Sequence, residues 1–230
     1  MRKSVSYFIA LTLVVASTFT FAVRDTTAQG AGLVSAVLNR MDQNRRSLKS
    51  LRANLVMQKY NAQIRDADES YGSLAYQPAK QSANVRVEWT KPQQEILAVR
   101  DGKYTLFRPR LGMAYEGSAN SKNGKVSSVL GFGLNVSGAE LRRQFDVEPL
   151  GKKEIEGAVV DHIKLTPRGK ASYQFAEVWV DGSGMPIQTR VVERNGDMTT
   201  VRLEGVRKNA PVAASDFQLS LPGNVKRVRA

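Results

Sequence analysis

The clearest pattern in the chain is an alternation of apolar and polar residues between positions 72 and 115. Val85, Val87 and Trp89 alternate with charged residues, which is the two-residue period of a strand with one buried face. Asp101-Gly102 lies between two apolar runs of this segment and favours the tight turn of a two-residue hairpin. The segment is therefore predicted to form consecutive antiparallel strands with one apolar face and one polar face.

Similar short apolar runs, separated by turn residues, recur through most of the remaining chain. Connectors as short as Asn195-Gly196 imply that successive strands are antiparallel neighbours. Together with the segment above, the pattern predicts roughly ten or eleven strands. The further strands are predicted over 51–62, 145–150, 159–166, 172–181, 186–193, 199–206 and 217–221.

Two segments have helical features instead. Between Gly30 and Ser50 the apolar residues, Leu33 among them, recur every three or four positions, which predicts one amphipathic helix. Ser137 and Glu140 have the spacing of a capping box, in which both side chains satisfy free N–H groups at a helix start. A short second helix is therefore predicted to begin there.

A sheet this wide must curl, because its strands twist. The predicted fold is mainly β with α: an unclosed antiparallel half-barrel of about ten or eleven strands, whose concave apolar face is covered by helices. So few helices can shield only part of that face. What remains is either an apolar cavity of the kind that binds hydrophobic ligands or a dry core.

The N-terminus has the features of a secretory signal peptide. Two basic residues precede an apolar run over 7–23, and small residues follow, so cleavage is expected near Ala22 or Ala28. We therefore predict a signal peptide over 1–28 and a single mature domain over 29–230, exported to the periplasm. The apolar run approaches the ~17 residues that span a bilayer, so an uncleaved anchor is the alternative.

Composition limits the chemistry of the mature domain. The chain has no cysteine, which excludes disulfides, thiolate metal sites and lipid attachment to cysteine. Its formal net charge of +13 attracts anionic partners, although export argues against nucleic acid. Because the basic residues are scattered along the chain, an ordinary solvated surface is the alternative interpretation.

No catalytic or metal-binding pattern emerges from the sequence. His162 is the only histidine and lies in a predicted strand, where an ordinary structural role is expected. Asp66, Asp68 and Glu69 crowd one predicted turn but lack the glycine and distal glutamate of a calcium loop. We therefore expect a protein that is not an enzyme and that needs no cofactor or metal.

Four short motifs follow one another in a characteristic order and spacing. They resemble those of the periplasmic outer-membrane lipoprotein carrier proteins of the LolA type, and the likeness covers about residues 33–225. The motifs are Gly72-Ser73-Leu74 followed by Pro78, Arg86-Val87-Glu88 with Pro92, Asp101-Gly102-Lys103 with Phe107 and Pro109, and the closing D-F-Q-L-S-L-P-G-N-V over 216–225.

The resemblance implies an unclosed barrel with helices at its mouth and a carrier function. Such carriers take acylated lipoproteins from an inner-membrane ABC-type release complex, ferry them across the periplasm, and pass them to an outer-membrane receptor; we expect a monomer. Gln77 stands where the family has an arginine that is tied to cavity closure and cargo release. Val87 stands where the family has tryptophan.

Apolar residues of the predicted concave face and lid are the candidates for acyl-chain binding, with ordinary core packing as the alternative for each. Two functional alternatives use the same fold: a carrier of another lipid, such as a phospholipid or glycolipid, and a lipid-responsive envelope sensor. The candidates are Leu55, Val85, Val87, Trp89, Leu97, Leu106, Val129, Leu130, Phe132 and Trp179.

Overall fold

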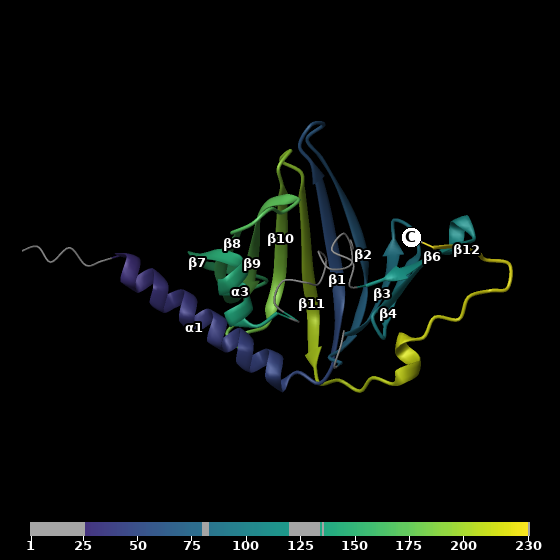
Figure 1. The fold of residues 1–230 in the computed structure, drawn as a ribbon, viewed down its shortest axis with the longest axis horizontal. Coiled ribbons are helices and arrows are strands. Elements are labelled where there is room, and N and C mark those ends of the chain that lie inside the picture. The colour runs from purple at the N-terminus through teal and green to yellow at the C-terminus, as the bar shows by residue number, and fades with distance from the viewer. Residues whose placement is uncertain (1–25, 80–82, 120–133, 135, 230) are drawn as a thin grey trace, which may run out of the picture.

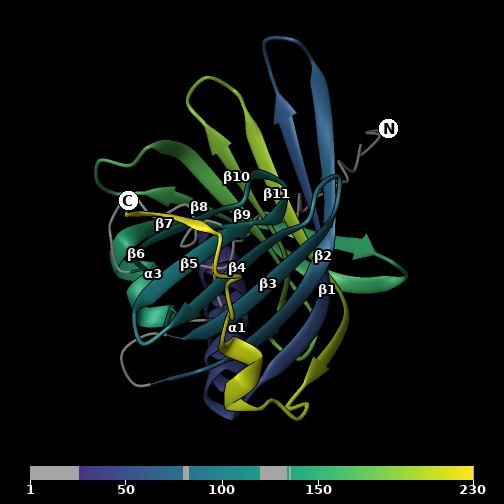
Figure 2. The same ribbon diagram turned by 90° about the vertical axis from the view of Figure 1, so that its right-hand side faces the viewer.

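One strongly curved sheet organises the described part of the chain. The computed structural model describes residues 26–79, 83–119, 134 and 136–229. Within these ranges twelve strands follow the order β12-β6-β5-β4-β3-β2-β1-β11-β10-β9-β8-β7 (Figures 1 and 2). The strands are β1 (Leu51–Asn61), β2 (Asp66–Gln77), β3 (Asn84–Lys91), β4 (Glu95–Arg100), β5 (Lys103–Arg108), β6 (Met113–Ser118), β7 (Phe145–Ile155), β8 (Ala158–Pro167), β9 (Tyr173–Val180), β10 (Pro186–Glu193), β11 (Met198–Lys208) and β12 (Lys226–Arg229).

The sheet consists of two antiparallel meanders that meet at its centre. Strands β1 to β6 form one meander and β7 to β11 form the other, and the long strands β1 and β11 pair with each other. Because β7 and β12 remain at opposite edges, the sheet does not close. The prediction of a mainly β, unclosed antiparallel half-barrel is confirmed, with one strand more than the upper estimate.

Two helices lie on the concave side of the β7–β11 half. Helix α1 (Thr26–Ser47) and helix α3 (Gly138–Gln144) contact each other and β7 (Figure 1). Their buried side chains form one apolar cluster with those of the neighbouring strands. The buried members of that cluster include Val34, Val37, Leu38 and Met41 of α1, Leu141 of α3, and Ile163, Leu165, Ala176, Val178 and Val180 of the sheet.

The helical pattern predicted the right element with two errors. Helix α1 ends at Ser47, so Leu48 lies beyond it and packs in the central cluster of the sheet. Leu33, expected on the buried stripe, is 55% exposed. Only one side of a helix this close to a sheet edge meets the strands, so an apolar residue slightly off that side stays in solvent.

The turn between β9 and β10 fixes the C-terminal half of α1. A Cβ atom on Gly184 would lie 2.1 Å from the carbonyl oxygen of Arg40, and Gly184 has a φ of +83°. Met185, the next residue, is fully buried, and its sulfur lies 3.4 Å from the side-chain nitrogen of Asn44. Arg40 also pairs with Asp161 of β8. Helix and sheet are therefore joined by close backbone contact, by packing and by the Arg40–Asp161 ion pair.

The C-terminal segment, residues 209–229, crosses the convex face of the sheet (Figure 2). Its short helix η2 (Ala214–Phe217) contacts β3 and β4, and the segment ends as β12, parallel to β6. The strand predicted over 217–221 is therefore wrong. Phe217 is 2% exposed, and Arg86 of β3 donates to the carbonyl oxygen of Gln218, so this stretch is anchored by side chains instead of a ladder.

Two further expectations concern local structure near the ends of elements. The acidic residues Asp66, Asp68 and Glu69 belong to strand β2 instead of a turn, since the turn occupies 62–65. The predicted signal peptide, 1–28, lies outside the described residues except for 26–28, which begin α1. The division into signal peptide and mature domain therefore stays a prediction.

Replacing Gly184 by alanine is expected to destabilise the fold by more than about 2 kcal/mol, because the new methyl group meets the α1 backbone in a left-handed conformation. Urea unfolding of both proteins measures the loss. Gly182→Ala in the same turn is the matched control, since nothing lies within 4 Å of its Cβ position. Equal stability of the two variants would contradict the proposed role of the turn.

Candidate functional site

Three of the sequence-predicted site residues lie together on the concave face at the centre of the sheet. Leu55 of β1 and Val85 and Val87 of β3 are buried in one apolar cluster. Strand β2 lies between them and contributes Leu74, which pairs with Val87, and Tyr76, which pairs with Val85. The three side chains that the two-residue period assigned to one face therefore lie in one cluster.

Three further candidates continue this surface toward β5. Val87 is opposite Leu97, and Leu97 is opposite Leu106, so one apolar row crosses β3, β4 and β5. Burial falls along the row: Val87 is 1% exposed, whereas Leu97 and Leu106 are only half-buried. Trp89, also half-buried, packs against the central cluster from the end of β3. The concave face thus carries apolar side chains beyond its fully buried centre.

The remaining candidates are not brought into this row. Trp179 lies on the opposite face of β9 from Ala176 and Val178, and its ring stacks on His162 with centroids 4.2 Å apart. Trp179 therefore does not lie on the concave face with Leu55, Val85 and Val87. The lid candidates Val129, Leu130 and Phe132 lie outside the described residues.

Tyr76 is a concave-face residue that the sequence analysis did not single out. It is 2% exposed, and its hydroxyl donates to the carbonyl oxygen of Leu134 at 3.3 Å. Burial raises the pKa of Tyr76 to about 12, so the hydroxyl keeps its proton and remains a donor. Two-residue alternation with Leu74 was the signal that could have identified it.

The neighbouring Gln77, at the position of the family's arginine, points to the other face. Its side-chain oxygen accepts from Asn84 at 3.4 Å. Successive side chains of a strand alternate between faces, so Tyr76 and not Gln77 reaches the concave side. The polar group that contacts Leu134 from β2 is therefore a hydroxyl instead of a guanidinium.

His162 lies on the convex face of β8, away from this surface. Neither ring nitrogen has a hydrogen-bond partner, although a Glu177 oxygen lies 3.6 Å from Nε2. Burial lowers the pKa of His162, partly offset by the Glu177 charge. The imidazole is therefore neutral near pH 7. In the described ranges no group of three His, Asp or Glu side chains is placed to hold a metal ion.

The sequence pattern of one protein family matches most of the chain. That family is described as "Outer membrane lipoprotein carrier protein LolA", and the match covers residues 46–220. The chain belongs to the LolA family. A search of curated proteins finds no match.

Solved structures agree with the LolA-type fold. A conserved protein of Thermus thermophilus is 10% identical, with a TM-score of 0.56, and the match covers 86% of this chain and 99% of that one. MucB is 15% identical with a TM-score of 0.54, and the match covers 82% of this chain and 63% of MucB. The MucA/MucB complex of Pseudomonas aeruginosa gives a TM-score of 0.51 at 16% identity, with coverage of 81% and 61%.

This LolA-family chain therefore spans less than two thirds of the length of MucB. At such identities the likeness shows the fold alone. Among the helices that the structure describes, none is long and apolar enough to cross a membrane.

The buried His162 predicts a specific loss of stability in mild acid. Because its pKa is lower in the folded protein, the unfolded chain binds the proton first as the pH falls below about 6.5. The stability present above that pH should be lost as the pH falls through the folded-state pKa. His162→Phe keeps an aromatic ring against Trp179 but does not titrate. Urea unfolding between pH 7.5 and 5 should show a steeper loss for the wild type, and parallel curves would contradict this.

Proposed function

We propose that this LolA-family protein is a periplasmic carrier that shields lipoprotein acyl chains on its concave face and ferries them from the inner to the outer membrane. The observation that carries the proposal is the apolar row Val87, Leu97 and Leu106. It runs from the buried centre of an unclosed sheet to side chains on β4 and β5 that are only half-buried. The family membership supports lipoprotein as the cargo class.

Such a surface can bind acyl chains without any polar contact. Each buried methylene contributes about 0.8 kcal/mol, so about ten of them contribute about 8 kcal/mol before the entropic cost of association. An apolar face sets no requirement for one chain length, although a longer chain buries more methylenes and binds more tightly. This suits a carrier, which must accept many lipoproteins and release each of them.

We propose that the hydrogen bond from Tyr76 to Leu134 helps to hold the lid, which contains Val129, Leu130 and Phe132. The bond joins the floor of the concave face to a residue that closely follows those lid candidates in the chain. A neutral hydrogen bond contributes only about 1 kcal/mol, so it can break when cargo enters or leaves. In this protein it would take the place of the contact made by the family's arginine.

The proposed carrier works between two membrane partners. Its expected donor is an inner-membrane ABC-type lipoprotein release complex, and its expected acceptor is an outer-membrane receptor. We propose that it acts as a monomer after removal of the signal peptide near Ala22 or Ala28, without catalysis and without a cofactor.

A lipid-responsive envelope sensor is the second candidate. It is favoured by the similarity to MucB, whose structure has also been solved in complex with MucA. A sensor would hold a lipid and a protein partner together, whereas a carrier gives its cargo to a receptor. Transfer of bound lipoprotein to outer-membrane vesicles distinguishes the two, because a sensor would retain the lipid.

Leu106→Gln is expected to weaken binding of a purified triacylated lipoprotein about tenfold or more, because it places an amide in the half-buried part of the apolar row. Fluorescence titration with a labelled lipoprotein measures the affinity. Stability should fall by only about 1 kcal/mol, since the site is not fully buried.

Thr105→Gln is the matched control, because its side chain lies on the convex face of the same strand. Equal affinities of the two variants would contradict acyl-chain binding on the concave face. A different outcome would move the assignment to the alternative lipid carrier. In that outcome the wild type binds free phospholipid but no lipoprotein, and Leu106→Gln binds the phospholipid more weakly.

Tyr76→Phe is expected to speed the release of a bound fluorescent acyl probe several-fold, because it removes the hydrogen bond to Leu134 and leaves that carbonyl unpaired. Stopped-flow dilution measures the rate. Tyr104→Phe is the control, since the Tyr104 hydroxyl has no partner in the described part of the chain and its ring packs against the same cluster. An unchanged release rate for Tyr76→Phe would contradict the proposed role of this hydrogen bond in holding the lid.

A further inference from the structure

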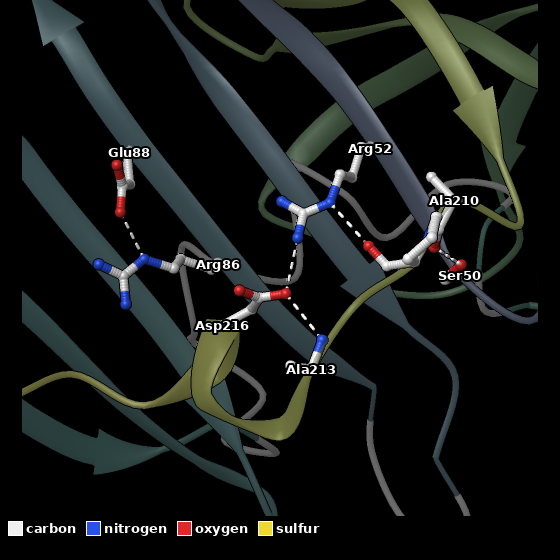
Figure 3. Close-up of polar contacts among 8 residues, drawn as sticks. Ser50, Arg52, Arg86, Glu88, Ala210, Ala213 and Asp216 are labelled. Atoms are coloured by element: carbon white, nitrogen blue, oxygen red, sulfur yellow. Dashed lines mark hydrogen bonds and ion pairs between the residues drawn. The ribbon is translucent and has the colours of Figure 1, made fainter.

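A polar pocket of about 560 Å³ lies on the convex face, on the other side of the sheet from the proposed acyl-chain surface. Strands β11, β1, β2 and β3 form its floor, and η2 of the C-terminal segment forms one wall (Figure 3). Nothing in the proposed carrier function uses this pocket. Its charged groups nevertheless form an ordered arrangement.

Small residues give the pocket its depth. Ser73 and Ala75 of β2 and Gly205 of β11 line it and leave the middle of the floor low. Gly205 has a φ of +57° and lies at a bulge, where β11 has one residue more than β1 between Arg52 and Asn54. Bulges of this kind redirect neighbouring side chains.

The bulge places two arginines directly opposite each other. Arg52 of β1 pairs with Arg207 of β11 in the strand register. Like charges in this position destabilise a sheet unless another group compensates them. Arg52 is compensated, since its Nη2 donates to Asp216 at 2.6 Å and its Nε donates to the carbonyl oxygen of Pro211 at 3.1 Å (Figure 3).

A third arginine is held on the far side of Ala75. Arg86 of β3 donates from Nε to Glu88 at 2.5 Å and from Nη1 to the carbonyl oxygen of Gln218 at 2.7 Å. A guanidinium group has five N–H donors, so Arg52 and Arg86 each use two in these bonds and keep others free. Both are held in place before any ligand arrives, which lowers the entropic cost of binding.

Arg207 is the group without compensation. In the described ranges it has neither an acidic partner nor a hydrogen bond, and its side chain is exposed at the pocket. The three arginines of the lining outnumber its two carboxylates, Glu88 and Asp216, so one positive charge remains. Asn54 and Ser73 add uncharged polar groups that also have no partner in the described part of the chain.

We propose that this convex pocket binds a phosphate group through Arg207, with Arg52, Asn54 and Ser73 as further donors. A tetrahedral phosphate presents oxygens in several directions, which matches donors that come from three adjacent strands. A planar carboxylate needs only one guanidinium group and would leave the other donors unused. The phosphate can belong to a soluble molecule or to a phospholipid headgroup, since both offer the same oxygens.

Calorimetric titration of the purified protein with inorganic phosphate at low ionic strength tests the proposal. Arg207→Gln should weaken phosphate binding about tenfold or more, because a charge-assisted contact is lost. Arg110→Gln, an exposed arginine of η1 (Pro109–Leu111) with the same charge change, should leave the affinity unchanged. Without phosphate, Arg207→Gln should be at least as heat-stable as the wild type, because the opposed charges are relieved.

Absence of phosphate binding by the wild type, or equal weakening by both variants, would overturn the proposal. Acetate binding as tightly as phosphate would also overturn it. Competition then identifies the source of the group: displacement of phosphate by phosphatidylglycerol vesicles supports a headgroup site, and displacement by glycerol 3-phosphate alone supports a soluble ligand. Leu106→Gln should leave phosphate binding intact, so failure of the acyl-chain surface and failure of this pocket are separable.

Discussion

The curvature of one wide antiparallel sheet is the constraint on which this structure depends. A twisted sheet of twelve strands has a concave face that must be covered by something apolar. On the β7–β11 half, α1 and α3 provide that cover, and the side chains beneath them are buried. Across β3 to β5 the same apolar alternation continues, from the buried Val87 to the half-buried Leu97 and Leu106. The proposed carrier surface arises from this incomplete cover.

The contact between α1 and the sheet positions one part of this cover. Close approach of the Gly184 turn to the Arg40 carbonyl, together with the buried Met185, holds the C-terminal half of the helix against the end of β9 and β10. The proposed carrier surface and the buried core are thus two parts of one apolar face.

The convex face has a different physical character. The C-terminal segment buries Phe217 against it and is held by Arg52 and Arg86 through Asp216 and Gln218. These arginines show how part of the large positive charge is used, since ion pairs and carbonyl contacts attach the chain to its own sheet. The opposed Arg207 is left over from this arrangement. The two faces therefore offer separate chemistries, apolar inside and cationic outside.

The sequence alone determined most of the helices and strands and, for many strands, which residues share a face. The period of two placed Leu55, Val85 and Val87 together because alternation is a local property of an extended backbone. The same pattern does not show which face of the sheet is concave, and Trp179 lies on the opposite face from Leu55, Val85 and Val87. The pattern also could not show that Arg52 lies opposite Arg207, because that pairing joins strands from opposite ends of the chain. Phe217 likewise lies in a sequence pattern typical of a strand. It belongs instead to η2, which contacts β3 and β4, and the sequence pattern does not show that contact. Long-range pairing and packing decided these points, since they depend on which distant surfaces meet and not on the order of neighbouring residues.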